Sequence, residues 1–223
     1  MKDFLIRGAI FDMDGTLLDS MSIWEHYAST YLRERGISAP PELDTAISTY
    51  TLADAAVYLK ETFGLPESPA ELLTGIDRST AALYETVLPK RGIPELLALL
   101  RECGIPMAVA TLTDRHVVER TLSRLGLIDY FSHIFICGEL GVRKDTPVIY
   151  DTALSALGTA REETAVFEDA WYAIKTASAA GYPVVAIHDP SSDRHFAKAE
   201  AVSALAVRDL AAVPWERYLP EKS

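Results

Sequence analysis

The feature that most constrains the fold is a series of short apolar runs, rich in Val, Ile, Phe and Ala, each too short to form a buried helix. They occupy residues 9–11, 106–110, 134–137, 165–167 and 184–187. Continuous apolar runs of this length are typical of parallel strands that are covered on both faces. Helical patterns fill most of the intervals between them. The sequence therefore predicts an α/β fold with a doubly wound, mostly parallel sheet.

Two of the intervening helices have clear signals at their ends. One is expected over 114–125, where Gly126 follows the last helical residue. The other is expected over 147–157, with Thr146 as its N-cap, proline in the first helical position and a glycine after its end. Helices that alternate with strands in this way support the α/β prediction.

Residues 19–91 have a different pattern, because helices follow one another there without strong strands. Two Ser-x-x-Glu capping boxes, at 22–25 and 68–71, are expected to start helices in this stretch. The pattern predicts an all-helical domain inserted directly after the first strand. We expect an α/β core domain made of 1–18 and 92–223, with the helical domain at 19–91.

Composition narrows the classes of partner. Among the 223 residues, 49% are hydrophobic, which is enough for a large core, and the net charge is -11. An acidic chain without a basic run is poorly suited to nucleic acid or to an anionic membrane, and no apolar stretch approaches the length of a membrane span. Cys103 and Cys137 have neither disulfide-framework nor metal-ligand spacing, which indicates a reducing compartment. We expect a cytoplasmic protein that acts on small molecules. We expect it to be a monomer, and a weak dimer is the alternative.

The strongest local motif is Asp12-Met13-Asp14-Gly15-Thr16, directly after the first predicted strand. Ligands of open parallel sheets bind beyond the carboxyl ends of the strands, so Asp12 and Asp14 are expected at that edge. Gly15 allows a sharp turn that brings backbone N–H groups close to an anion. Two such close carboxylates need a cation or a proton, and both outcomes suit phosphoryl transfer. Two other interpretations of this motif fit less well. A calcium-binding loop would need glutamate at its twelfth position, where Ile23 stands, and a solvated turn would not be expected directly after an apolar strand.

Three later positions strengthen this interpretation. Thr111 ends the second predicted strand, Lys144 precedes the helix that begins at residue 147, and Glu168 and Asp169 end the fourth predicted strand. Taken singly, such residues are usually a cap, a solvated lysine and a surface acidic pair. Taken together, they place a hydroxyl, an ammonium and two carboxylates at the same sheet edge as Asp12.

In this order along the chain, the motifs resemble those of the haloacid dehalogenase (HAD) superfamily. The first motif is Asp12-Met13-Asp14-Gly15-Thr16, the second is Thr111, the third is Lys144 and the fourth is the acidic pair Glu168-Asp169. The chain looks most like its phosphatases and β-phosphoglucomutase-like members, whose helical cap is inserted between the first and second motifs. The resemblance implies a Rossmann-like HAD core with a cap. Two departures stand out: Lys144-Asp145-Thr146-Pro147 replaces the frequent Lys-Pro-x-Pro, and Ala170 and Ala173 replace a serine and a glycine after the acidic pair.

The resemblance implies a mechanism and a magnesium cofactor. Asp12 would be the nucleophile that forms an aspartyl phosphate, and Asp14 would be the general acid and base. Mg²⁺ would lie between Asp12, the backbone carbonyl of Asp14 and Asp169, with Glu168 coordinating through water or orienting a ligand. Thr111 and Lys144 complete the expected catalytic group. The expected phosphate-binding residues are Gly15, Thr16, Thr111, Leu112 and Lys144.

Substrate contacts are harder to predict. Asp19, Trp24, His26 and His116 are candidates, although His26 also suits an ordinary helix surface and Trp24 an ordinary core position. Asp14 disfavours carbon–halogen cleavage, which needs no acid at this position.

The leading interpretation is a hydrolase, a phosphatase acting on a small phosphorylated metabolite such as a sugar phosphate. A phosphomutase is the alternative, and it needs a basic cap residue, for which Lys60 and Arg78 are candidates. A response-regulator receiver would carry its acidic pair on the first strand and would lack the helical insert. A non-catalytic phospho-ligand binding protein is disfavoured by the intact acidic motifs.

Overall fold

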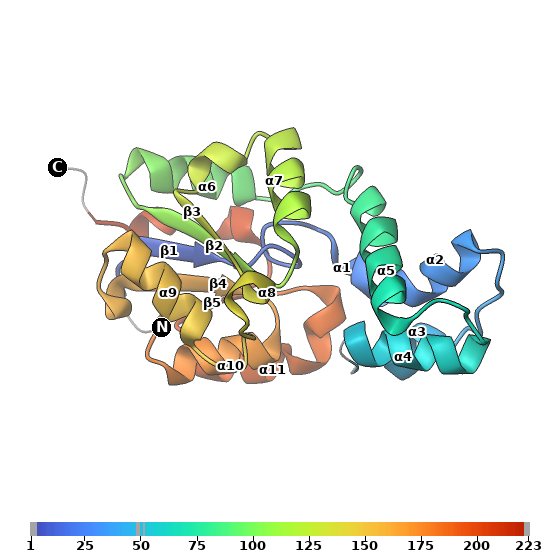
Figure 1. Ribbon diagram of the computed structural model, residues 1–223. Coiled ribbons are helices and arrows are strands. Elements are labelled where there is room, and N and C mark those ends of the chain that lie inside the picture. The colour runs from blue at the N-terminus through green and yellow to red at the C-terminus, as the bar shows by residue number, and fades with distance from the viewer. Residues whose placement is uncertain (1–3, 48–49, 51, 221–223) are drawn as a thin grey trace. The chain divides into compact units, whose positions relative to one another are not determined.

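The computed structural model describes residues 4–47, 50 and 52–220 (Figure 1). The chain divides into two compact units, which we call the core unit and the helical unit. The core unit is Met1–Asp19 with Leu88–Ser223, and the helical unit is Ser20–Val87. Residues 19 and 88–91, which the sequence analysis assigned to the helical domain, therefore lie in the core unit.

Within the described residues, six strands form one sheet in the core unit, in the order β3-β2-β1-β4-β5-β6, and all neighbouring pairs are parallel. The strands are β1 (Gly8–Phe11), β2 (Met107–Thr111), β3 (His133–Ile136), β4 (Thr164–Glu168), β5 (Val184–Ile187) and β6 (Leu205–Val207). Every residue of β1, β2, β4 and β5 is buried, which explains why these strands read as continuous apolar runs. The predicted parallel α/β sheet is confirmed.

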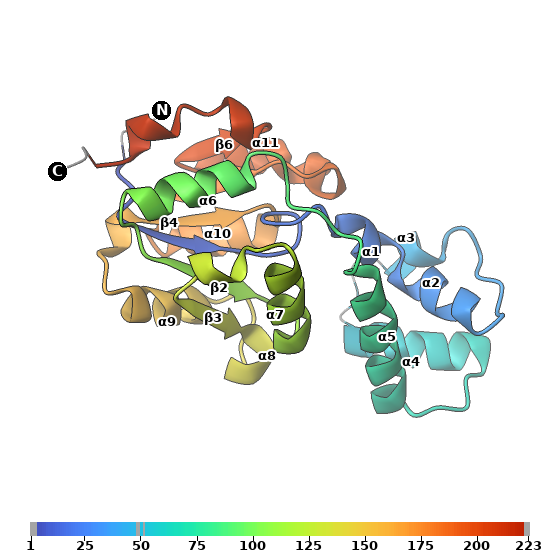
Figure 2. The ribbon, with the colours of Figure 1, turned by 90° about the horizontal axis from the view of Figure 1, so that it is seen from above.

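Helices cover both faces of this sheet (Figures 1 and 2). One face carries α6 and α7, and the other carries α9, α10 and α11. The helices of the core unit are α6 (Ile93–Glu102), α7 (Arg115–Arg124), α8 (Cys137–Leu140), α9 (Val148–Leu157), α10 (Trp171–Ala179) and α11 (Asp193–Val202). Short 3₁₀ helices are η1 (Ile128–Tyr130), η2 (Arg161–Glu163), η3 (Pro190–Ser192), η4 (Leu210–Ala212) and η5 (Trp215–Tyr218). The arrangement is doubly wound, as predicted.

Two local details differ from the sequence predictions. Pro147, not Thr146, is the N-cap of α9, and the Thr146 hydroxyl donates to the Arg143 carbonyl instead. The segment after residue 213, which carries few sequence signals, packs on the core unit through Trp215 and Tyr218, both buried. The backbone N–H of Ile6 donates to the Tyr218 carbonyl at 2.7 Å, so this segment is tied to the chain just before β1.

The helical unit contains α1 (Met21–Glu25), α2 (Tyr27–Glu34), α3 (Leu43–Ile47), α4 (Leu52–Phe63) and α5 (Pro69–Leu83). Its apolar core is contributed by α2 to α5. The capping box at Ser68 is confirmed, with reciprocal hydrogen bonds between Ser68 and Glu71. The box predicted at Ser22 is wrong, because the N-cap is Ser20 and Ser22 lies inside α1. No helix in the described part of the chain has the length and apolar character needed to cross a membrane.

The two segments that lead out of and back into the core unit are paired. Leu18 forms an antiparallel bridge with Pro89, and the Lys90 backbone N–H donates to the Leu17 carbonyl at 2.9 Å. The Lys90 ammonium reaches the loop after β5 and donates to Asp189 at 2.6 Å. A buried ion pair therefore fixes the returning segment to the carboxyl edge of the sheet.

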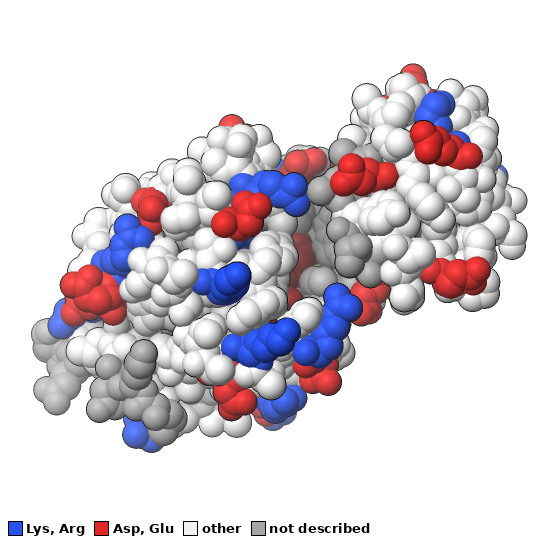
Figure 3. Space-filling view, turned by 90° about the horizontal axis from the view of Figure 1, so that it is seen from below, with Lys and Arg blue, Asp and Glu red and all other residues white. Residues whose placement is uncertain are grey.

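Charged side chains are mixed on the face of the molecule shown in Figure 3. Lys and Arg lie among Asp and Glu there, and several Lys and Arg side chains lie near one another in the lower middle of the view.

Candidate active site

The first motif forms a tight loop at the carboxyl end of β1. The Asp12 backbone N–H continues the sheet by donating to the Phe167 carbonyl at 3.0 Å. Gly15 has a φ of 75°, a left-handed conformation that favours glycine. A Cβ at Gly15 would lie 2.6 Å from Cγ of Asp169. Glycine is therefore needed both for the turn and for the close approach of the loop to Asp169.

Lys144 is the centre of the charged cluster. It lies in the loop between α8 and α9, is 2% exposed, and donates to Oδ1 of Asp12 and to Oε1 of Glu168. The bond to Glu168 is 2.5 Å long. One ammonium thus bridges carboxylates from the ends of β1 and β4.

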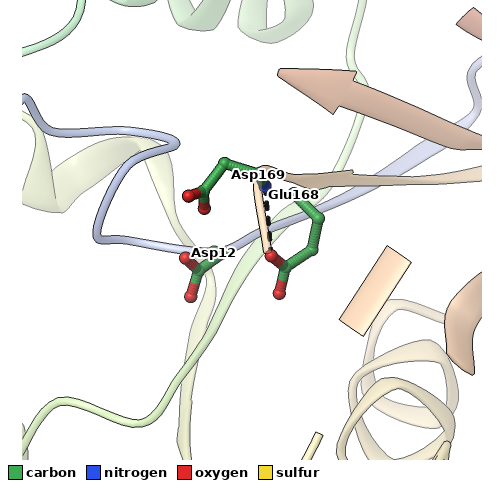
Figure 4. Close-up of side chains that lie close together, drawn as sticks. All are labelled: Asp12, Glu168 and Asp169. Atoms are coloured by element: carbon green, nitrogen blue, oxygen red, sulfur yellow. Dashed lines mark hydrogen bonds between the residues drawn. The ribbon is translucent and has the colours of Figure 1, made fainter. Parts of the chain in front are cut away.

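The acidic pair at the end of β4 lies close to Asp12 (Figure 4), and its two carboxylates have different hydrogen-bond partners. Oε1 of Glu168 accepts hydrogen bonds from Lys144 and from the Tyr150 hydroxyl at 3.1 Å. Oε2 of Glu168 accepts from the backbone N–H groups of Asp169 and Ala170, at 3.2 and 3.3 Å. Each oxygen of Glu168 therefore has two donors, which leaves this carboxylate little capacity to bind a ligand directly.

Asp169 is only 5% exposed, but its carboxylate accepts fewer of the hydrogen bonds described here than Glu168 and so has more capacity to bind a ligand. Its Oδ1 accepts a hydrogen bond from the Thr16 hydroxyl at 3.2 Å. Thr16 is itself fully buried in the loop after β1. The first and fourth motifs are therefore joined directly by side chains.

Threonines of the second motif form a further chain of hydrogen bonds. The Thr113 backbone N–H donates to the Thr111 hydroxyl oxygen at 3.1 Å. The Thr113 hydroxyl donates to Oδ2 of Asp14 at 2.5 Å. The Thr111 oxygen thus accepts from the backbone, and its own proton can be donated to a bound anion.

Burial dominates the electrostatics of the cluster. It raises the pKa of Asp12 to about 8, because the favourable charge of Lys144 does not offset burial together with Glu168 and Asp14. Burial, then Glu168 and Asp12, raise the pKa of Asp169 well above its ordinary value. For Lys144, burial favours a lower pKa, but Asp12 and Glu168 outweigh it and keep the ammonium charged. The site therefore carries more buried carboxylates than its single ammonium can balance.

This excess of negative charge is what a divalent cation would offset. Carboxylate oxygens of Asp12, Glu168 and Asp169 lie within 4.8 Å of one another. An all-oxygen donor set is the kind that magnesium prefers. The residues present therefore fit a magnesium ion, with Asp12 and Asp169 as the carboxylates still able to bind it.

Most of the predicted site residues are brought together. The cluster unites Asp12, Asp14, Thr16, Thr111, Lys144, Glu168 and Asp169 through the contacts described above. Gly15 shapes the same loop, and Leu112 lies between the two threonines with half of its surface exposed.

Other candidates lie outside this hydrogen-bond network. Asp19 is exposed in the core unit, and His116 is exposed on α7. Trp24 and His26 belong to the helical unit. There the Trp24 indole donates to the Tyr84 hydroxyl at 3.0 Å, and His26 lies 3.7 Å from Asp44 with a largely exposed ring.

Two residues of the network, Thr113 and Tyr150, were not predicted from the sequence. Thr113 stands two residues after Thr111, a signal that a second hydroxyl follows the same strand. Tyr150 lies in the first turn of α9, where nothing in the sequence marks it as a partner of Glu168. Two bulky residues follow the acidic pair, of which Trp171 packs against the core and Tyr172 is 47% exposed.

Comparisons with known proteins identify the family. The sequence profile of the haloacid dehalogenase-like hydrolases matches residues 9–187. Validoxylamine A 7'-phosphate phosphatase of Streptomyces hygroscopicus subsp. limoneus is 28% identical, over 97% of this chain and 100% of that protein. Fructose-1-phosphate phosphatase of Escherichia coli is 30% identical, over 80% of this chain and 94% of that protein. The crystal structure of CbbY from Rhodobacter sphaeroides with phosphate has the same fold, with a TM-score of 0.79, 21% identity and coverage of 94% and 97%. The chain is thus a member of the haloacid dehalogenase-like hydrolase family.

Proposed function

We propose that this protein is a magnesium-dependent phosphatase that hydrolyses the phosphate monoester of a small metabolite. The observation that carries the proposal is the buried cluster in which Lys144 bridges Asp12 and Glu168 beside Asp169. The two relatives described above are both phosphatases of small phosphorylated compounds, and the substrate that one of them is named for, fructose 1-phosphate, is a sugar phosphate. A sugar phosphate is therefore the first class of substrate to test.

Five groups would bind the ion or the phosphoryl group. Asp12, Asp169 and the backbone carbonyl of Asp14 would hold magnesium, while Glu168 orients Lys144 and the loop after β4. The ion would offset negative charge on the phosphoryl oxygens. Lys144 and the free proton of the Thr111 hydroxyl would bind those oxygens as charge develops on them.

The chemistry then takes place in two displacements. In the first, a carboxylate oxygen of Asp12 bonds to phosphorus as the ester P–O bond breaks, and Asp14 delivers a proton to the leaving alcohol oxygen. In the second, Asp14 takes a proton from a water molecule that attacks phosphorus. The bond between phosphorus and Asp12 then breaks, which releases inorganic phosphate and regenerates both carboxyl groups.

The phosphomutase alternative is less well supported. A mutase needs a basic cap residue for a second phosphate, but the Lys60 ammonium donates to the carbonyls of Leu65 and Glu67, at 3.0 and 2.5 Å. It stabilises the turn after α4 and is poorly available to a ligand. Arg78, exposed on α5, is the remaining predicted candidate.

The test is phosphate release from a panel of sugar, sugar-alcohol and nucleoside monophosphates, with Mg²⁺ or with EDTA. Asp12→Asn should abolish release, because an amide is a poor nucleophile, whereas Asp129→Asn at an exposed site in η1 should leave it unchanged. Product analysis would separate the alternatives, since a mutase yields an isomerised sugar phosphate. Release that persists in EDTA or in the Asp12→Asn variant would refute the proposal.

A further inference from the structure

We propose, building on the phosphatase function above, that Thr113 is a positioning residue that holds the Asp14 carboxyl group in place for proton transfer. Thr113 lies in the loop between β2 and α7, two residues beyond Thr111. Its hydroxyl donates to Oδ2 of Asp14 at 2.5 Å. The bond joins residues that are 99 positions apart in the chain.

Thr113 is itself firmly held. It is 6% exposed, and its backbone N–H is fixed by the hydrogen bond to the Thr111 hydroxyl oxygen. Immediately after it, the Asp114 carbonyl accepts from the N–H groups of Val117 and Val118 and starts α7. A β-branched side chain on such a backbone has few rotamers available, so its hydroxyl is a rigid donor.

The two threonines have different roles because each hydroxyl has only one proton. The Thr111 oxygen accepts from the backbone and keeps its proton for a phosphoryl oxygen. The Thr113 proton is directed to Oδ2 of Asp14, which fixes the orientation of the carboxyl group that transfers the proton. Thr113 thus acts through Asp14 and does not contact the reacting phosphorus.

This role gives a signature that depends on the leaving group. When an alkyl ester bond breaks, the alkoxide needs the proton from Asp14, so misorientation of Asp14 slows formation of the aspartyl phosphate. The p-nitrophenolate ion leaves without a proton, so the same step with p-nitrophenyl phosphate should be nearly insensitive. Since kcat/KM reports only the steps up to release of the first product, it isolates this difference.

The experiment compares Thr113→Val and Thr113→Ser on p-nitrophenyl phosphate and on the sugar phosphate that the wild-type protein hydrolyses fastest. For Thr113→Val, we expect kcat/KM for the sugar phosphate to fall on the order of 10- to 100-fold, as for loss of a hydrogen bond to a catalytic group. For p-nitrophenyl phosphate, kcat/KM should change less than about threefold. Its kcat should fall with a burst of p-nitrophenolate, because Asp14 still has to activate water in the second displacement. Thr113→Ser should restore both activities.

Controls make the outcomes distinct. Thr152→Val removes a hydroxyl that only bonds the Val148 carbonyl within α9, and it should match the wild type on both substrates. Thermal unfolding of Thr113→Val should show that the variant is folded, and its crystal structure should show the Asp14 carboxylate rotated. If Thr113→Val lowers kcat/KM equally for both substrates, or does not lower it for the sugar phosphate, the proposed role of Thr113 is overturned. A wild-type protein that releases no phosphate from any compound would instead refute the phosphatase function, and the role of Thr113 with it.

Discussion

Lys90 should contribute strongly to the stability of the core unit, through its ion pair with Asp189. The Lys90 side chain is 13% exposed and that of Asp189 is 2% exposed. Oδ2 of Asp189 accepts from the Lys90 ammonium at 2.6 Å, while Oδ1 accepts from the backbone N–H and hydroxyl of Ser191, at 2.9 and 2.7 Å. Lys90→Met would remove the ammonium, keep an apolar stem of similar length, and leave a buried carboxylate.

The expected cost follows from what remains around Asp189. Removing one partner of a fully buried ion pair costs about 3–5 kcal/mol. Here Ser191 still provides two hydrogen bonds and Lys90 is slightly exposed, so we expect a loss of about 2 kcal/mol in the free energy of unfolding near neutral pH. Arg91→Met is the matched control. The Arg91 side chain is 80% exposed where it pairs with Asp209, so the loss of its charge should cost less than about 1 kcal/mol.

The pH dependence of this effect has a definite sign. Burial favours a raised pKa for Asp189, but hydrogen bonds from Lys90 and Ser191 outweigh it and hold this pKa below its ordinary value. The pair therefore stabilises the protein above the pKa of Asp189 in the unfolded chain, about 3.9, and this stabilisation is lost as pH falls through the folded pKa. The cost of Lys90→Met should accordingly shrink below about pH 4.

Urea unfolding, followed by tryptophan fluorescence at several pH values, would measure these differences. A double-mutant cycle with Asp189→Asn should recover part of the loss, because the amide no longer leaves a charge buried. A Lys90→Met variant no less stable than Arg91→Met near neutral pH, or one whose cost does not fall in acid, would refute the reasoning.

Three further predictions concern the active site. Gly15→Ala should lower kcat on the order of 100-fold, because the added Cβ would displace Asp169. Gly36→Ala is the control: Gly36 has a φ of 72° and no atom within 4 Å of an added Cβ, so this change should reduce stability but not kcat. Equal kcat values in the two variants would contradict this prediction. Magnesium at about 100 times its Kd should raise the free energy of unfolding by about 2.7 kcal/mol relative to protein in EDTA. Asp169→Asn should abolish most of this gain. A thermal shift assay measures the stabilisation, and a melting temperature that magnesium does not change would count against a magnesium site. Tyr150→Phe should destabilise the protein by about 1–3 kcal/mol in urea unfolding, because a buried donor to Glu168 is lost; a neutral effect would show that this bond contributes little.

The fold was predictable where burial leaves a continuous record in the sequence. Strands β1, β2, β4 and β5 are buried throughout, so their apolar runs could be recognised. Strand β6 (Leu205–Val207) is three residues long and partly exposed at the sheet edge, which is too little signal to separate it from a loop. The false capping box at Ser22 has the right residue types. Yet α1 already begins at Met21, so Ser22 lies inside the helix, and the residue types alone do not reveal this shift.

The site was predictable to the same extent. Asp12, Thr111 and Asp169 lie at the carboxyl ends of neighbouring parallel strands, which must meet at one edge of the sheet. The contact of Thr113 with Asp14 depends on how the loop before α7 turns. The contact of Tyr150 with Glu168 depends on the rotation of α9 about its axis. Neither property leaves a local pattern in the sequence, so these two residues emerge only from the structure.

The position of β1 in the sheet has a consequence for synthesis of the protein. Ala9 pairs with Met107 on one side and with Ala165 on the other, so β1 leaves the ribosome long before either partner strand. The helical unit, by contrast, is one continuous segment, Ser20–Val87, whose contacts are complete once that segment has emerged. We therefore expect the helical unit to fold first during translation, while β1 keeps both edges unpaired until β2 is made and one edge unpaired until β4 is made. The nascent chain should be most prone to aggregation, and most dependent on chaperones, during that interval.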